Sequence, residues 1–187
     1  MRKYGYVLLC LSSLFFFQCG GNTPKDEASR IVTEWSGKII KFPSDASCFS
    51  LANDSLEALK LMDNTPFKVL LYTDSVGCAK CELGLDIWNI LIKEADSTFH
   101  GKLSFLFYFQ PKYVRDLQLA MQEENFTYPV FIDRYNSIEH LNGFPKDDRF
   151  RCFLLDKDNK VVLIGNPVLN PAIWELYKKV IRENSLP

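Results

Sequence analysis

The clearest hydrophobic pattern in the chain runs through residues 67–88, FKVLLYTDSVGCAKCELGLDIW. An apolar run over residues 69–72 predicts a buried strand, and residues 73–77 predict a short polar turn. From residue 85 onward apolar side chains recur at intervals of three, which predicts a helix with one buried face. The stretch therefore predicts a strand, a turn and a helix in succession.

Strands and helices alternate along the rest of the chain. Residues 103–109 (LSFLFYF) are almost wholly apolar, as in a strand that helices cover on both faces. Shorter strands are expected over residues 38–42 and 128–133, and residues 150–165 predict a hairpin with a charged tip at 156–160. Helices are expected over residues 55–62 and 113–125, and from Pro171 on with Asn170 as its cap. Residues 138–144 are expected to form a short helix or a turn. This alternation predicts an α/β structure with an antiparallel edge.

Composition and charge narrow the class of protein. The chain has 187 residues, of which 47% are hydrophobic, and this is enough for one domain with a substantial core. Its net charge is -1 and it has no long basic run, so nucleic acid is not an expected partner.

The N-terminus has the pattern of an export signal. Arg2 and Lys3 precede an apolar stretch over residues 7–17, which is shorter than the roughly 20 residues of a membrane span. We therefore predict a signal peptide over residues 1–18. A buried N-terminal helix is the disfavoured alternative.

Cys19 directly follows the apolar stretch and is followed by two glycines, which resembles the cleavage site of bacterial lipoproteins. The sequence departs from that pattern at Phe17 and Gln18, where small residues are usual. The resemblance implies a lipid anchor at Cys19 and a location in the bacterial cell envelope, at the outer membrane facing the periplasm. Residues 19–30 are then expected to form a flexible tether, and residues 31–187 the folded domain with its N-terminal extension.

Two cysteines, Cys78 and Cys81, stand two residues apart where the predicted strand gives way to the helix. A C-x-x-C in this context is a thioredoxin-type redox arrangement. The helix N-terminus and Lys80 would lower the pKa of the Cys78 thiol, which makes Cys78 the attacking thiolate and Cys81 the resolving one. Asp74 is either a proton shuttle to Cys81, if it is buried, or a solvated turn residue.

The order of elements, with C-x-x-C after the second strand, resembles the thioredoxin fold. The strand and helix predicted over residues 128–144, before the final hairpin, are similar to the insertion of membrane-tethered envelope thioredoxins and of peroxiredoxins. The chain also resembles the thioredoxin-like lipoproteins common in Bacteroidetes. The resemblance implies a central mixed sheet flanked by helices, with the strand-helix insertion before the hairpin. It also implies exchange with protein thiols or disulfides of the envelope, and no cofactor.

The sequence departs from the thioredoxin pattern in three places. Gly77 replaces the usual tryptophan before the first cysteine, and Ala79-Lys80 replaces a proline-containing pair. The cis-proline that normally precedes the hairpin would fall at Phe150 or Arg151. Pro129 would take that role only if the predicted topology were different.

These departures leave other functions open. A non-catalytic binding or accessory lipoprotein with a fixed Cys78–Cys81 disulfide is the main alternative. A metal site is disfavoured, since a tetrahedral site needs four ligands and no second C-x-x-C or H-x-x-x-H is present. Peroxidase activity is weaker still, because no P-x-x-x-T-x-x-C run surrounds Cys78.

The remaining cysteines and aromatic residues have simpler interpretations. Cys152 is expected to be a buried small residue, with an approach to the active pair as the minority alternative. A disulfide between Cys48 and Cys152 is left open. Trp88 and Trp174 are expected in the core. The isolated histidines, His100 and His140, are expected at the surface.

Overall fold

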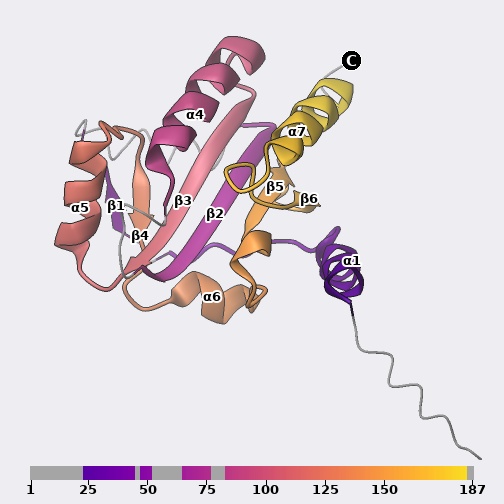
Figure 1. Ribbon diagram of the computed structural model, residues 1–187, viewed down its shortest axis with the longest axis horizontal. Helices are drawn as coiled ribbons and strands as arrows, with labels where there is room; N and C mark the ends of the chain where they lie inside the picture. The colour runs from indigo at the N-terminus through magenta and orange to yellow at the C-terminus, as the bar shows by residue number, and fades with distance from the viewer. Residues whose placement is uncertain (1–22, 45–46, 52–64, 77–82, 185–187) are drawn as a thin grey trace, which may run out of the picture.

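A six-stranded mixed sheet forms the centre of the molecule (Figure 1). The computed structural model describes residues 23–44, 47–51, 65–76 and 83–184. The strands lie in the order β1-β4-β3-β2-β5-β6. They are β1 (Ser47–Phe49), β2 (Phe67–Val76), β3 (Leu103–Pro111), β4 (Val130–Ile132), β5 (Cys152–Asp156) and β6 (Val161–Ile164).

The strand directions divide the sheet into a parallel centre and antiparallel edges. β2, β3 and β4 are parallel neighbours, whereas β1 pairs antiparallel with β4 and the β5-β6 hairpin pairs antiparallel with β2. The predicted mixed α/β sheet, the inserted strand β4 before the hairpin, and the hairpin itself are confirmed.

Helices cover both faces of the sheet, as the apolar strands require. One face packs against α4 (Leu85–Phe99), α5 (Val114–Glu123) and α7 (Pro171–Asn184), and the other against α1 (Pro24–Trp35) and α6 (Ser137–Asn142) (Figure 1). A short 3₁₀ helix, η1 (Asp148–Phe150), precedes β5. In the part of the chain that the structure describes, no helix combines the length and apolarity needed to span a membrane.

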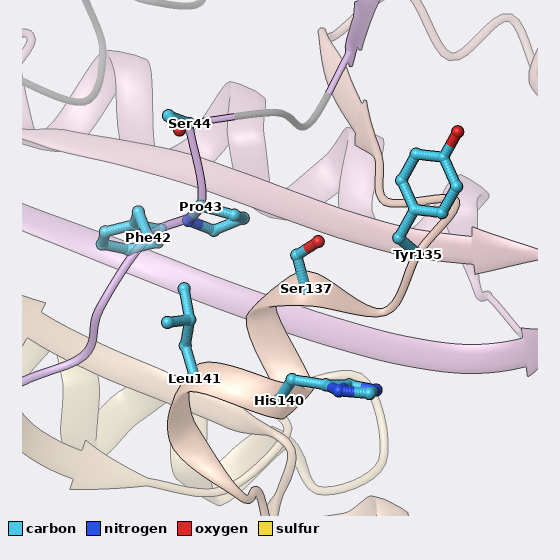
Figure 2. A pocket seen from close by; sticks show the side chains of 7 residues that line it. All are labelled: Phe42, Pro43, Ser44, Tyr135, Ser137, His140 and Leu141. Atoms are coloured by element: carbon cyan, nitrogen blue, oxygen red, sulfur yellow. The ribbon is translucent and has the colours of Figure 1, made fainter.

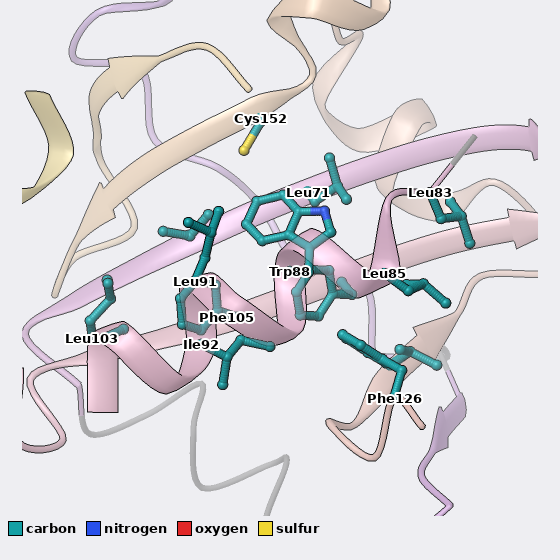
Figure 3. Close-up of a cluster of buried hydrophobic side chains, with 14 of the residues drawn as sticks. Leu71, Leu83, Leu85, Trp88, Leu91, Ile92, Leu103, Phe105, Phe126 and Cys152 are labelled. Carbon is teal, nitrogen blue, oxygen red and sulfur yellow. The ribbon is translucent and has the colours of Figure 1, made fainter. Parts of the chain in front are cut away.

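Strand β3 is buried on both faces, as its sequence predicts. Phe105 and Phe107 point to the α4 face, and Leu106 and Tyr108 point to the α1 face. Trp88 of α4 lies on the first face among other buried apolar side chains (Figure 3). Its ring centroid is 5.2 Å from that of Phe107, in an edge-on arrangement. The predicted core position of Trp88 is confirmed, and Trp174 is also buried.

The tether predicted over residues 19–30 is wrong from Pro24 on, because α1 begins there. Thr23 and Asp26 form a capping box: the Thr23 Oγ accepts from the Asp26 N–H at 3.2 Å, and an Asp26 carboxylate oxygen accepts from the Thr23 N–H at 3.0 Å. The helix then buries Ile31 and Trp35 against the sheet. The start of α1 depends on capping rather than on apolar periodicity, so the hydrophobic pattern does not reveal it.

Two other predictions differ from the structure. The strand expected over residues 38–42 is only a single bridge between Ile39 and Lys160. The polar turn expected over residues 73–77 is strand as far as Val76, because β2 continues to pair with β3. Strand β1 was not predicted, and the helix expected over residues 55–62 lies outside the described residues.

Helix α6 depends on one buried carboxylate. The two Asp133 oxygens accept the N–H groups of Ser137 and Ile138, each at 2.8 Å. Replacing Asp133 by alanine should lower the free energy of unfolding by about 1–2 kcal/mol, since both donors would lose their acceptor. Urea unfolding measures this loss. Asp133→Asn keeps one acceptor and should lose less; equal losses in the two variants would contradict the capping role.

Helices α4 and α7 are joined by a carboxylate at the edge of the core. The two Glu94 oxygens accept from the Trp174 indole N–H at 2.8 Å and from the Lys178 ammonium at 2.6 Å. The hydrogen bond from Lys178, aided by the one from Trp174, lowers the pKa of Glu94, although partial burial opposes the shift.

This lowered pKa makes the contribution of Glu94 to stability depend on pH. The contribution is fully present above the unfolded-state pKa of a glutamate and is lost as the pH falls through the lower folded-state pKa. The stability difference between the natural chain and a Glu94→Gln variant should therefore shrink between neutral pH and about pH 3. Urea unfolding at both pH values measures it, and a difference that stays constant would contradict the predicted linkage.

Candidate functional site

The C-x-x-C motif lies in the connection between β2, which ends at Val76, and α4, which begins at Leu85. Cys78, Lys80 and Cys81 fall outside the described residues, so their roles remain predictions. The same holds for the lipid anchor at Cys19. What the structure does describe is the surroundings of this connection.

Gly84 ends the connection in a left-handed conformation, with φ of +58°. A Cβ at this position would lie 2.7 Å from a methyl carbon of Val168. A side chain would therefore be strained both by the backbone and by the close approach of the 166–170 loop.

Arg151 directly precedes β5 and lies beside Tyr72 of β2. The Tyr72 N–H donates to the Arg151 carbonyl at 3.0 Å, and the next residue, Cys152, pairs with Leu71. Arg151 therefore occupies the place before the hairpin where the resemblance leads us to expect a cis-proline. The described peptide bonds include no cis bond.

The Arg151 guanidinium is enclosed by four oxygen atoms, and its side chain is only 11% exposed. Nη1 contacts one carboxylate oxygen of Asp74 at 2.7 Å and one of Asp148 at 2.9 Å. Nε donates to the Pro145 carbonyl at 2.7 Å, and Nη2 donates to the Lys146 carbonyl at 3.1 Å. The guanidinium thus ties the loop between α6 and η1 to β2.

Asp74 lies on β2 with its side chain 41% exposed and ion-paired to Arg151. It is therefore not the free residue of a polar turn, and the burial on which the predicted proton shuttle to Cys81 depends is not observed. Sequence reasoning identified Asp74 but missed its partner, because 77 positions separate Asp74 from Arg151.

Tyr72 lies on the buried side of Arg151 and Asp74, and these three residues form a cluster at β2. Its hydroxyl contacts the Asn136 side-chain oxygen at 2.6 Å, and its ring lies 5.7 Å from the Arg151 guanidinium carbon. Burial, aided by the Asp74 carboxylate, raises the pKa of Tyr72 well above its usual range, so the phenol stays protonated.

Pro129 does not reach this cluster. It precedes β4, and β3 lies between β4 and β2. Val130 pairs with Phe107 of β3, and Phe107 pairs with Leu71 of β2, so the width of β3 separates Pro129 from β2. The alternative topology, in which Pro129 would take the cis-proline position, is wrong.

The two described cysteines are free thiols on opposite sides of the sheet. Cys48 lies in β1, and Cys152 lies in β5 with three strands between them. At a strand spacing of about 4.8 Å the separation is roughly 19 Å, so a Cys48–Cys152 disulfide is ruled out in this fold. Cys152 is fully buried beside Trp88 (Figure 3). The prediction that Cys152 is a buried small residue is confirmed.

Burial decides how Cys152 reacts. It raises the pKa of the Cys152 thiol to about 12, with only partial relief from the Tyr177 hydroxyl. We expect iodoacetamide to leave Cys152 unmodified in the native protein at about pH 8 and to modify it in denaturant. Mass spectrometry of digested protein distinguishes the two. Fast native modification of Cys152 would contradict the buried placement.

A hollow of about 510 Å³ lies beside α6 on the α1 face of the sheet (Figure 2). Its lining residues are Phe42, Pro43, Ser44, Tyr135, Ser137, His140 and Leu141. His140 is exposed, as predicted, and so is His100. No sequence motif pointed to this hollow, because its walls come from separate segments.

Comparison with known proteins gives structural neighbours only. No protein-family model matches the chain, and no curated protein matches it. The thioredoxin domain of a thiol-disulfide oxidoreductase from Bacteroides vulgatus aligns with a TM-score of 0.51 at 12% identity, over 76% of this chain and 97% of that one. A thioredoxin-like protein in its oxidised form gives 0.52 at 11% identity, over 80% and 98%. Peroxidoxin BcpB from Mycobacterium tuberculosis gives 0.51 at 15% identity, over 79% and 96%.

At these identities the likeness establishes the fold. The chain has the thioredoxin-like α/β fold, with a mixed six-stranded sheet flanked by helices. The predicted fold class is thereby confirmed. Membership of a lipoprotein family remains a prediction from the sequence.

Proposed function

We propose that the protein exchanges thiols and disulfides with client proteins of the bacterial cell envelope. The single observation that carries this proposal is the position of Cys78 and Cys81 in the β2–α4 connection of a thioredoxin-like fold. The named neighbours include a thiol-disulfide oxidoreductase, which supports a redox role of this general kind.

The proposed exchange has two steps. The Cys78 thiolate attacks a client disulfide, so a mixed disulfide forms and one client thiolate leaves. The Cys81 thiolate then attacks Cys78, the second client thiolate leaves, and the Cys78–Cys81 disulfide remains. The client gains two electrons and the pair loses two, so a thiol reductant must restore the pair. In the reverse direction the same pair oxidises client thiols.

An assay on the whole chain, purified in detergent, tests this proposal. We expect the reduced protein to accelerate the reduction of insulin by dithiothreitol. About two of its thiols, those of Cys78 and Cys81, should react fast with DTNB. The reduction potential of the pair sets the direction of exchange. A protein that leaves the insulin reaction at its uncatalysed rate would contradict the proposal.

The envelope location is part of the proposal and rests on the sequence of residues 1–21. We propose that Cys19 carries the lipid and anchors the protein in the outer membrane, facing the periplasm. Incorporation of labelled palmitate into the natural chain, and its loss in Cys19→Ala, would support the anchor. Equal labelling of both chains would contradict it.

A specific observation favours a second candidate function. Arg151 occupies the place where related exchange proteins have the cis-proline, and it is held there by Asp74 and Asp148. A non-catalytic accessory lipoprotein that uses the fold as a binding scaffold would tolerate this replacement. Stable recovery of one partner by both the natural chain and the Cys78→Ser, Cys81→Ser double variant, without exchange activity, would favour this candidate.

A further inference from the structure

A patch of exposed basic and aromatic residues lies at the carboxyl ends of β3 and β4. It consists of Lys112, Tyr113, Arg134 and Tyr135, and we call it the carboxyl-edge patch. All four residues are exposed, with Tyr113 59% and Tyr135 78% accessible. Single exposed aromatic residues are common on protein surfaces. Packing of the core does not require two of them to lie beside two cations that have no ion-pair partner.

The strand register brings the two halves of the patch together. Phe109 of β3 pairs with Ile132 of β4, and the Asp133 N–H donates to the Phe109 carbonyl at 2.9 Å. Lys112 and Arg134 therefore follow neighbouring parallel strands out of the same edge of the sheet. This edge is the usual place for ligand sites in sheets of this kind.

The same register places the patch beside the C-x-x-C connection. Pro111, the residue before Lys112, pairs with Val76, which is the last residue of β2. A molecule that contacts Lys112 and Tyr113 thus lies next to the point where the chain leaves β2 toward Cys78. On the other side of β2, Arg151 is already engaged by Asp74.

The charges of the patch are not neutralised by neighbours. Among the described residues, neither Lys112 nor Arg134 has an ion-pair partner, whereas Arg149, Arg151 and Lys178 all do. The Lys112 ammonium lies 5.5 Å from the centre of the Tyr113 ring.

Asp133 and Asp116 lie within three residues of the patch along the chain, and neither of these described residues forms an ion pair with Lys112 or Arg134. The Asp133 carboxylate is buried, and both of its oxygens accept N–H groups of α6. Asp116, in the first turn of α5, is exposed beside the equally exposed Arg115. Asp74 and Glu139 also lie in this region, but Asp74 is paired with Arg151, and a Glu139 oxygen accepts the Phe144 N–H. Among the described residues, Lys112 and Arg134 therefore have no carboxylate partner.

The patch continues into the hollow beside α6, which has both apolar and polar walls. Tyr135 also lines the hollow beside α6, where Phe42 and Leu141 supply apolar surface and His140 supplies a further basic group (Figure 2). None of the described residues that line this hollow carries a carboxylate. A partner that suits the whole surface combines negative charge with apolar or aromatic side chains.

We propose that the carboxyl-edge patch docks an acidic, extended segment of the client protein and so presents the client disulfide to Cys78. The inference rests on the proposed function and deepens it by naming the client class. Carboxylates of the segment pair with Lys112 and Arg134, its backbone passes Tyr113 and Tyr135, and an apolar side chain enters the hollow. Two isolated cations are too few for a nucleic-acid backbone, which is contacted by many.

Fluorescence anisotropy tests the patch independently of redox chemistry. The full chain with Cys78→Ser and Cys81→Ser is mixed with a labelled acidic peptide that contains two leucines. Adding Lys112→Gln and Arg134→Gln should weaken binding about fivefold at low ionic strength, since two exposed ion pairs contribute up to about 1 kcal/mol. Raising the salt to physiological strength should remove most of this difference.

A matched control removes the same charge elsewhere. Lys93 on α4 and Lys102 before β3 are exposed and lie away from the carboxyl ends of the strands. The Lys93→Gln, Lys102→Gln pair should bind the acidic peptide as the parent does. Equal weakening by both pairs, equal binding of a lysine-rich peptide, or tighter binding of a short oligonucleotide would each overturn the proposal.

The two proposals fail separately. If the protein binds the acidic peptide through the patch but the natural chain exchanges no disulfides, the docking surface stands and the exchange function falls. If exchange is normal but the Lys112→Gln, Arg134→Gln pair neither weakens peptide binding nor raises KM for an acidic disulfide substrate, the docking proposal falls alone.

Discussion

Replacing Cys78 by serine is expected to abolish disulfide exchange, whereas replacing Cys81 by serine is expected to trap the client. A serine hydroxyl cannot replace the thiolate that attacks a disulfide, so the Cys78→Ser rate should fall by roughly 10³-fold or more, to the uncatalysed level. Cys81→Ser keeps the attacking thiol but removes the one that resolves the mixed disulfide. Insulin reduction measures the first effect, and non-reducing electrophoresis detects the trapped species.

Cys48 offers a matched control for both variants. It is a half-buried free thiol on β1, at the far edge of the sheet from β2. Cys48→Ser should leave exchange unchanged and trap nothing. Exchange that persists in Cys78→Ser, or that is lost in Cys48→Ser, would assign the chemistry to another thiol.

Replacing Arg151 by alanine is expected to lower the free energy of unfolding by about 3 kcal/mol. The guanidinium is nearly buried and satisfies the Pro145 and Lys146 carbonyls as well as two carboxylates. Its removal leaves carbonyl oxygens without a donor and releases the loop before β5 from β2. Urea unfolding gives the loss directly.

Comparison of single variants separates the ion pair from the loop contacts. Asp74→Asn alone should cost less than Arg151→Ala, because Asp74 is 41% exposed and remains partly hydrated. Arg151→Lys keeps the charge but cannot reach all four oxygens, so it should recover only part of the stability. An Arg151→Ala variant as stable as the natural chain would refute the anchoring role.

The sequence predicts those elements whose residues carry their own signal. The apolar run of β3 and the charged tip of the β5-β6 hairpin are local patterns, and both appear in the structure. The capping box at Thr23 is also local, but it lies in a polar stretch that reads as a tether. Element type was therefore predictable for elements with a long buried pattern, whereas the short apolar run at residues 38–42 predicted a strand where a single bridge forms.

The surroundings of the candidate site were not predictable in the same way. Asp74 and Arg151 meet only because β5 pairs with β2, and no local feature of either residue signals the other. Lys112 and Arg134 likewise come together through the register of β3 and β4. Long-range pairing decides these contacts, and single-sequence patterns describe neighbours along the chain.

The antiparallel docking of β5 against β2 has a consequence for folding. The pairing of Leu71 with Cys152 closes a long stretch of chain and raises the contact order, which slows folding. Until the C-terminal hairpin has been synthesised, β2 has an open edge that can pair with other chains. A nascent chain that stops before residue 150 should therefore need a chaperone, and deletion of the hairpin should yield aggregate rather than a smaller soluble domain.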